Sequence, residues 1–439
     1  MTLQHLTSPI GRLPDRVLSI IFDRASKQDE RHSAADAQNN PILLVLAQVC
    51  KRWRGIVLGS WERVEVFNHV EWLDLVLSHS QAPLLDVRFH RVRAAEDALA
   101  RSLLKEHASR VRRLSLCWRK VDADPESPTC GWQRVNNKVY QMSLSVLKSL
   151  HIHNADIDRA ARASRMLDGP CRLHVLHTLR LTNTIIPWES TVFERLRVLH
   201  LEQIKTKPLL SLDAFLAVLQ RCTLLEELTL AHAFPVDFPD RRDAKPVRAA
   251  GSFRIVVLPW LRTVNFVWGR KEGPWKDRME VLQMIGHMYL SARASVTIDI
   301  EHWGFHGDGL RHVVHPRKDL LPILSTATTI YATSFPGKQG VFEAKNDEGG
   351  SLTVIVTNRQ EDGRWAYRVE DQLRNFCEIL LQHSAPVRKI SIESWEVDKA
   401  TVTRGFGSTL TAIEILTGER TQFASIALGV ADVAPRVAR

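Results

Sequence analysis

The sequence predicts an α/β protein in which a small N-terminal helical domain precedes an irregular solenoid of parallel strands with helical returns. Two observations lead to this prediction: apolar residues recur with helical spacing between residues 13 and 57, and short apolar triplets recur from residue 111 onward. The chain has 439 residues, 44% of them hydrophobic and 25% charged, which is typical of folded protein and excludes a mainly disordered, collagen-like or membrane-spanning chain.

The N-terminus carries no recognisable secretory signal, because no cationic start is followed by an apolar core and a small-residue cleavage site. The six cysteines stand at positions 50, 117, 130, 171, 222 and 377, without a CxxC pair or a dense framework. Such scattered cysteines fit a reducing compartment. We therefore expect a cytoplasmic or nuclear protein with no membrane partner.

Two short amphipathic helices are predicted near the N-terminus. Pro14 suits a first helical turn, and Val17, Leu18 and Ile21 follow at i, i+1 and i+4. A polar stretch at 24–40 predicts a loop before the second helix. Helices this short bury little surface on their own, so they need a partner surface. The apolar stripe of the second helix comprises Leu46, Val49, Cys50, Trp53, Ile56 and Val57.

These residues resemble a known pattern, in which Leu-Pro-x-x-apolar-Leu precedes a variable loop and a Val-Cys-Lys-Arg-Trp-Arg block, here residues 49–54. Residues 1–62 thus resemble the F-box, in particular the F-box-like segment of large families of fungal proteins from mushrooms. The resemblance implies docking onto the Skp-type adaptor of a cullin ligase core. The adaptor-binding residues that it implies are Leu13, Pro14, Val17, Leu18, Ile21, Phe22, Val49, Cys50 and Trp53. The alternative is a helical hairpin that packs on the rest of the chain and binds no adaptor.

Triplets of the form apolar-x-x-apolar-x-apolar predict the strands of an irregular leucine-rich-repeat region at 111–439, reached through a connecting segment at 63–110. Between two triplets, Leu212, Phe215, Leu216 and Leu219 predict a helical return. The triplets are Val111-Leu114-Leu116, Leu147-Leu150-Ile152, Leu176-Leu179-Leu181, Leu196-Leu199-Leu201, Leu225-Leu228-Leu230, Leu261-Val264-Phe266, Val387-Ile390-Ile392 and Leu410-Ile413-Ile415, with weaker candidates centred on Ile298 and Ile330.

An insertion is predicted near 317–370, where the repeat is interrupted. Val354-Ile355-Val356 and Trp365-Ala366-Tyr367 flank a turn-forming sequence at 361–364, as the two strands of a β-hairpin would. Residues 345–351, rich in Gly, Asn and Asp, predict a turn or a flexible loop.

Successive side chains of a strand point to opposite faces, so the residues between the apolar ones share one open face. We predict that an unknown target protein binds this face, whose charge changes from basic to acidic along its length. The order of segments resembles the layout of the same family, which implies the substrate-recognition adaptor of an SCF-type (Skp, cullin, F-box) ubiquitin ligase. The predicted target-binding residues are Arg113, His151, His153, Arg180, His200, Asp299, Glu301 and Tyr331.

No P-loop, GxGxxG or GxSxG motif occurs, so we expect no enzyme, no catalytic residue and no cofactor. His302, His306, His312 and His315 are residues of zinc-binding type, but their spacing matches no recognised site, so no metal is expected. The net charge of +10 attracts polyanions, yet no nucleic-acid motif accompanies it, and nucleic acid is not an expected partner. The alternative function is a repeat scaffold, or a basic nucleic-acid-binding protein, without a role in ubiquitin transfer.

Overall fold

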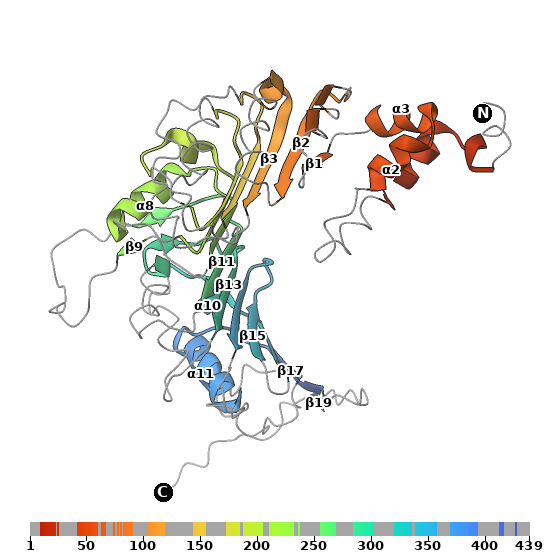
Figure 1. The fold of residues 1–439 in the computed structure, drawn as a ribbon. Coiled ribbons are helices and arrows are strands. Elements are labelled where there is room, and N and C mark those ends of the chain that lie inside the picture. Colours follow the sequence, from red (N-terminus) through yellow and green to blue (C-terminus); the bar gives the residue numbers. More distant parts are fainter. Residues whose placement is uncertain are drawn as a thin grey trace, which may run out of the picture. The chain divides into compact units, whose positions relative to one another are not determined.

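The structure is a computed structural model, and it divides the chain into two compact units, Met1–Val192 (unit 1) and Phe193–Arg439 (unit 2), which are described separately. Figure 1 shows the elements of both units. The residues that the structure describes are 9–22, 24–25, 42–59, 63–66, 73–74, 77–78, 80, 82–90, 104, 106–118, 144–154, 173–184, 188–204, 210–231, 236–237, 255–268, 284–301, 320–335, 339–357, 369–393, 412–416 and 426–427.

The N-terminal part of unit 1 is helical. A 3-10 turn, η2 (Pro9–Arg12), precedes a helix at residues 15–22, which begins directly after Pro14. The carbonyl of Pro14 accepts hydrogen bonds from the backbone N–H groups of Val17 and Leu18, at 2.9 and 3.1 Å. Two further helices follow, α2 (Ile42–Val49) and α3 (Lys51–Gly59).

Five strands of unit 1 form a parallel sheet in which spatial order follows sequence order, β1-β2-β3-β4-β5. The centre residues Leu114, Leu150 and Leu179 lie side by side in the register and are buried. Two of the strands, β1 and β2, lie in the segment 63–110, to which the sequence analysis assigned no strand. The elements are β1 (Arg63–Val66), β2 (Leu85–His90), η3 (Ala108–Arg110), β3 (Val111–Trp118), β4 (Ser149–Asn154) and β5 (Thr178–Thr182).

The first strands of unit 2 are also parallel, in the order β6-β8-β11-β13. The predicted helical return between the first two is confirmed as α8 (Leu212–Arg221), which buries Phe215, Leu216 and Leu219. The remaining elements of this part are η4 (Thr191–Arg195), which begins at the border of the units, β6 (Val198–Glu202), β7 (Leu210–Ser211), β8 (Glu227–Ala231), β9 (Val236–Asp237), β10 (Val256–Val257), β11 (Thr263–Trp268), β12 (Met288–Tyr289) and β13 (Ser295–Glu301).

The parallel order is then interrupted by an antiparallel meander of β14 (Thr329–Phe335), β15 (Gln339–Lys345) and β16 (Ser351–Thr357). Lys345 and Ser351 are register partners, which confirms the predicted turn between them. The predicted hairpin of 354–356 with 365–367 is wrong, because β16 has both edges occupied, by β13 and by β15. Its turn at 361–364 lies outside the described residues.

The C-terminal part returns to parallel pairing, with β14 next to β17 and β17 next to β18, and ends with β19 antiparallel to β18. All ten centre residues of the predicted triplets, including the two weaker ones, therefore lie in strands. Figure 1 shows α8, α10 and α11 on the same side of the unit 2 strands. The remaining elements are α10 (Ile323–Thr326), α11 (Val369–Gln382), β17 (Lys389–Glu393), β18 (Ala412–Leu416) and β19 (Ile426–Ala427).

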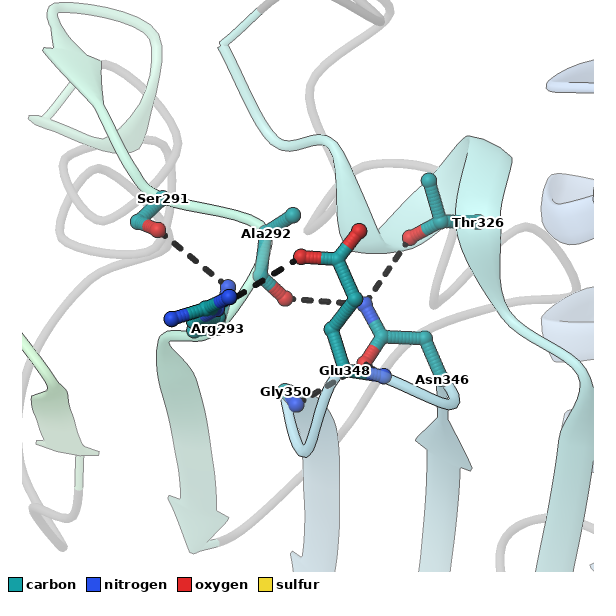
Figure 2. A network of polar contacts seen from close by, with 7 residues as sticks. All are labelled: Ser291, Ala292, Arg293, Thr326, Asn346, Glu348 and Gly350. Carbon is teal, nitrogen blue, oxygen red and sulfur yellow. Dashed lines mark hydrogen bonds and ion pairs between the residues drawn. The ribbon is translucent and has the colours of Figure 1, made fainter.

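The turn between β15 and β16 is held by one buried side chain, Asn346 (Figure 2). Its Nδ2 donates to the carbonyl of Ala292 at 2.8 Å and to Oγ1 of Thr326 at 3.0 Å. Its Oδ1 accepts from the backbone N–H groups of Glu348 and Gly350, at 3.1 and 2.8 Å. A Cβ atom at Gly350 would collide with the carbonyl oxygen of Ala292. The meander is therefore attached to the segment before β13 by contacts that need an amide at 346 and no side chain at 350.

Candidate adaptor and target interfaces

The helix at 15–22 has two apolar faces. Leu18 and Phe22 are one turn apart and buried, with relative exposures of 0% and 2%. Val17, Ile20 and Ile21 form the other face and are exposed, Ile20 at 52%. Water contact with so many large apolar groups is unfavourable, at roughly 25 cal/mol per Å². The second face therefore gains free energy from any apolar surface that covers it.

The described apolar side chains of α2 and α3 differ in exposure. Val45 and Val49, one turn apart on α2, are exposed at 51% and 44%. On α3, the ring of Trp53 packs against Phe22 with centroids 5.0 Å apart. At the start of α3, Sγ of Cys50 accepts a hydrogen bond from the backbone N–H of Trp53 at 3.4 Å, so this thiol satisfies one of the N–H groups that a helix start leaves open.

One charged side chain ties α3 to the start of the first helix. Nη2 of Arg52 lies 2.6 Å from the Oδ1 atom of Asp15 and 2.6 Å from the carbonyl oxygen of Leu13. Nε of Arg52 donates to the same carboxylate oxygen at 2.8 Å. These contacts, together with the Trp53–Phe22 pair, hold the two helices in a defined relation.

The predicted adaptor-binding residues divide by burial. The structure buries Leu18 and Phe22, half-buries Leu13, Cys50 and Trp53, and exposes Pro14, Val17, Ile21 and Val49. We name Val17, Ile20, Ile21, Val45 and Val49 the exposed apolar set. Sequence reasoning missed Ile20 and Val45, although Ile20 follows Val17 by three residues and Val45 precedes Val49 by four, a helical spacing that signals a shared face.

The polar face of the unit 1 sheet carries cations and histidines. His151 lies between Ser115 and Arg180 in the register, and Nδ1 of His151 is 3.5 Å from Oγ of Ser115. Arg113 and Arg180 are exposed, whereas His151 and His153 are half-buried.

Asp86 on β2 forms ion pairs with two arginines of β3. It is buried, and Nε of Arg112 lies 3.0 Å from its Oδ1 atom. Nη1 of Arg113 lies 3.7 Å from its Oδ2 atom. The aspartate therefore orients Arg113 while leaving most of this side chain, 60% by relative exposure, in solvent.

The corresponding face of unit 2 carries both acids and lysines around the meander. The Tyr331 hydroxyl donates to Oε2 of Glu393 at 2.6 Å, and Lys345 forms an ion pair with Glu343 at 2.9 Å. The hydrogen bond to Glu393, together with burial and the repulsion of Glu393 and Glu343, raises the pKa of Tyr331. The phenol therefore remains a neutral donor between two carboxylates.

The structure separates residues that the sequence analysis placed in succession. Two strands, β16 and β15, lie between Asp299 on β13 and Tyr331 on β14. Asp299 and Tyr331 are half-buried, as is His200, whose Nε2 lies 3.6 Å from Glu202, while the side chain of Glu301 lies outside the described residues. The meander also brings Glu343 and Lys345 to this face, and β17 brings Glu393; sequence reasoning missed all three. The predicted turn at 345–351 was the one sequence feature that indicated a chain reversal, and hence additional residues on this face.

The residues that the structure describes contain no group of three His, Cys, Asp or Glu that could hold a metal ion, and the histidines at 302–315 fall outside them. Burial raises the pKa of Cys222 and of Cys377 to about 12, so both thiols stay protonated at neutral pH. Among the helices of the described part, none is long and apolar enough to cross a membrane.

Comparison with known families identifies the N-terminal region. Residues 10–65 match the F-box-like family. This range covers η2 from its second residue, the helix at 15–22, α2 and α3. The chain therefore carries an F-box-like domain at its N-terminus, joined to a region dominated by parallel strands. No curated protein matches the chain.

Proposed function

We propose that this protein is the substrate-recognition adaptor of an SCF-type ubiquitin ligase, in which the F-box-like domain binds a Skp-type adaptor and thereby the cullin core. F-box-like domains generally bind Skp-type partners, which supports this assignment. The observation that carries it is the exposed apolar set, because five large aliphatic side chains on a small helical domain indicate an interface.

The strand region belongs to the same proposal as an irregular leucine-rich-repeat region that presents a target protein. Its support is the coincidence of the ten predicted centre residues with strands, their burial where the structure describes them, and the mixed polar residues on the opposite face. The likeness to mushroom F-box-like proteins is part of this proposal. The adaptor makes no bond itself, because holding a target near the ubiquitin carrier raises its local concentration.

The test is coexpression of the full chain with a Skp-type adaptor, followed by affinity capture and size-exclusion chromatography. The intact chain is expected to form a stoichiometric complex. Ile20→Glu combined with Val49→Glu should abolish capture, because two charges would then be desolvated at an apolar interface. Both side chains are exposed in the free chain, so the melting temperature should change little.

The matched control is Val257→Glu combined with Tyr289→Glu. These two residues are exposed at 58% and 44% and are register partners in the β10–β12 pair of unit 2. This control adds the same two charges and should leave capture intact. Absence of a complex with the intact chain, or equal loss in both double variants, would refute adaptor docking and favour a repeat scaffold without a ubiquitin role.

A further inference from the structure

We propose that the polar face of unit 1 binds an extended acidic segment of the target protein, which runs obliquely across β3, β4 and β5. This inference rests on the proposed function, since it names the chemical class of segment that the target-binding face accepts. Arg113 and Arg180 would bind the acidic side chains of the segment. His151 lies near the line between the two arginines, and His153 lies two residues further along β4.

The first step of the argument is charge. Arg113 and Arg180 are the exposed residues of β3 and β5 on this face, and their cations project into solvent. Within β2–β5, Asp86 is the single acid whose side chain the structure describes. It is buried, and it pairs with Arg112 at 3.0 Å and with Arg113 at 3.7 Å. An approaching carboxylate therefore meets positive charge with little competing negative charge, which favours both encounter and correct pairing.

The second step is spacing. Arg113 is the register partner of Ser149, which pairs with Thr178, and Arg180 lies two residues beyond Thr178. With about 4.8 Å between strands and about 3.3 Å per residue, the two Cα atoms are separated by about 12 Å. Side chains at i and i+4 of an extended peptide are about 13 Å apart. Carboxylates at these two positions therefore match the two guanidinium groups.

The third step concerns the residue between the two arginines. The midpoint of the diagonal from Arg113 to Arg180 falls on β4, between Ser149 and His151. An acidic side chain at i+2 of the same peptide would therefore meet the imidazole of His151, which can donate a hydrogen bond from a ring N–H. Alternate acidic residues, rather than a contiguous acidic run, fit this face.

A protein segment suits the face better than nucleic acid does. Single-stranded nucleic acid is held by aromatic side chains on which bases stack. On the polar faces of β2–β5, the side chains that the structure describes include none of Phe, Trp or Tyr, since Phe89 is buried. On the corresponding face of unit 2, Glu343 and Glu393 are accompanied by Lys345 and Lys389, so an acidic segment meets both signs of charge there and binding is expected on unit 1.

Fluorescence anisotropy of the full chain with a labelled 12-residue peptide tests the inference. The peptide alternates Asp with Ser; control peptides carry Asn in place of Asp, or the same number of Asp residues in one block. The alternating peptide should bind most tightly. Arg113→Glu combined with Arg180→Glu should weaken its binding by about 10- to 100-fold, because each reversal replaces an exposed attraction by a repulsion.

The matched control is Arg195→Glu combined with Arg262→Glu, which reverses two exposed cations of unit 2 that lie outside the unit 1 face. It should change the affinity by less than about threefold. Arg180→Gln, which only removes charge, should give a smaller loss of about three- to tenfold and guards against a folding defect in the double reversal.

Three outcomes would overturn the inference. The first is equal weakening by both double reversals, and the second is equal binding of the Asn and Asp peptides. The third is that duplex DNA displaces the peptide from the intact chain and no longer binds the variant with both Arg113 and Arg180 reversed. The last outcome would assign the face to nucleic acid. Adaptor capture is measured on the same preparations. Capture without peptide binding rejects this inference alone, whereas peptide binding without capture rejects the ubiquitin proposal.

Discussion

The F-box-like helices and the strands that carry the predicted triplets differ in how far they bury their apolar side chains. In the strands, residues such as Leu150, Leu179 and Leu228 have relative exposures of 1% or less, so the apolar residues of the alternating pattern are buried. In the helices, Leu18 is buried while Ile20, two residues further, is 52% exposed. Apolar residues of similar hydrophobicity are therefore buried in one region and exposed in the other. The triplet strands bury these side chains in their own core, whereas the helical domain leaves the exposed apolar set in contact with water.

The largest expected effect comes from truncating apolar side chains in each region. Leu228→Ala should lower the free energy of unfolding of unit 2 by about 3–5 kcal/mol, because a fully buried leucine leaves a cavity. Ile20→Ala should change the stability of the chain by less than about 0.5 kcal/mol, because the side chain is exposed. Urea unfolding with hydrogen-exchange detection resolves the two regions. A loss at Ile20 comparable to that at Leu228 would end the distinction.

The second effect contrasts one glycine from each region. Gly350→Ala should destabilise the meander by about 1–3 kcal/mol, because the added Cβ collides with the backbone carbonyl of Ala292. Gly55→Ala should stabilise α3 by about 0.5–1 kcal/mol, since no atom lies within 4 Å of its added Cβ and alanine is the better helix former. Opposite shifts in thermal stability are expected, and shifts of the same sign would contradict the packing described for either site.

The third effect compares the polar contacts that hold each region. Asn346→Ala should cost about 1–3 kcal/mol, because the removed amide leaves buried backbone groups of the turn without partners (Figure 2). Arg52→Met should cost at most about 1 kcal/mol, since its ion pair with Asp15 is exposed and screened by solvent. Repeating both measurements in 1 M salt separates the contacts, because only the Arg52 effect should shrink.

The sequence predicted the parts of the fold that depend on local periodicity. The triplets located ten strands because each places alternate apolar residues into one core, and α8 was found from its 3–4 spacing. The strands β1 and β2 were missed because only single short alternations, such as Val64 and Val66, mark them.

Long-range order was harder to predict from the sequence. The position of β15 and β16 between β13 and β14 depends on which strand edges meet, which local pattern does not encode. For the same reason, Asp299 and Tyr331 were expected in succession on one face. The two faces of the first helix were likewise merged, because Val17 and Leu18 are both apolar and only packing distinguishes them.

The smallest expected effect is a titration in the strand region. The raised pKa of Tyr331 means that folding favours the neutral phenol, so its contribution to stability is present below the ordinary tyrosine pKa near 10 and is lost as pH rises through the higher folded value. Among the four tyrosines, Tyr331 should therefore ionise late in absorbance measurements at about 295 nm. Glu393→Gln should bring that ionisation to lower pH, because the hydrogen bond to a carboxylate and its repulsion of a phenolate both disappear. Tyr331→Phe should remove the late component, and its stability difference from the intact chain should be constant between about pH 7 and 9 and diminish above that range. If Glu393→Gln left the titration unchanged, or if Tyr331→Phe removed an ordinary component instead of the late one, the contact across β14 and β17 would not persist in solution.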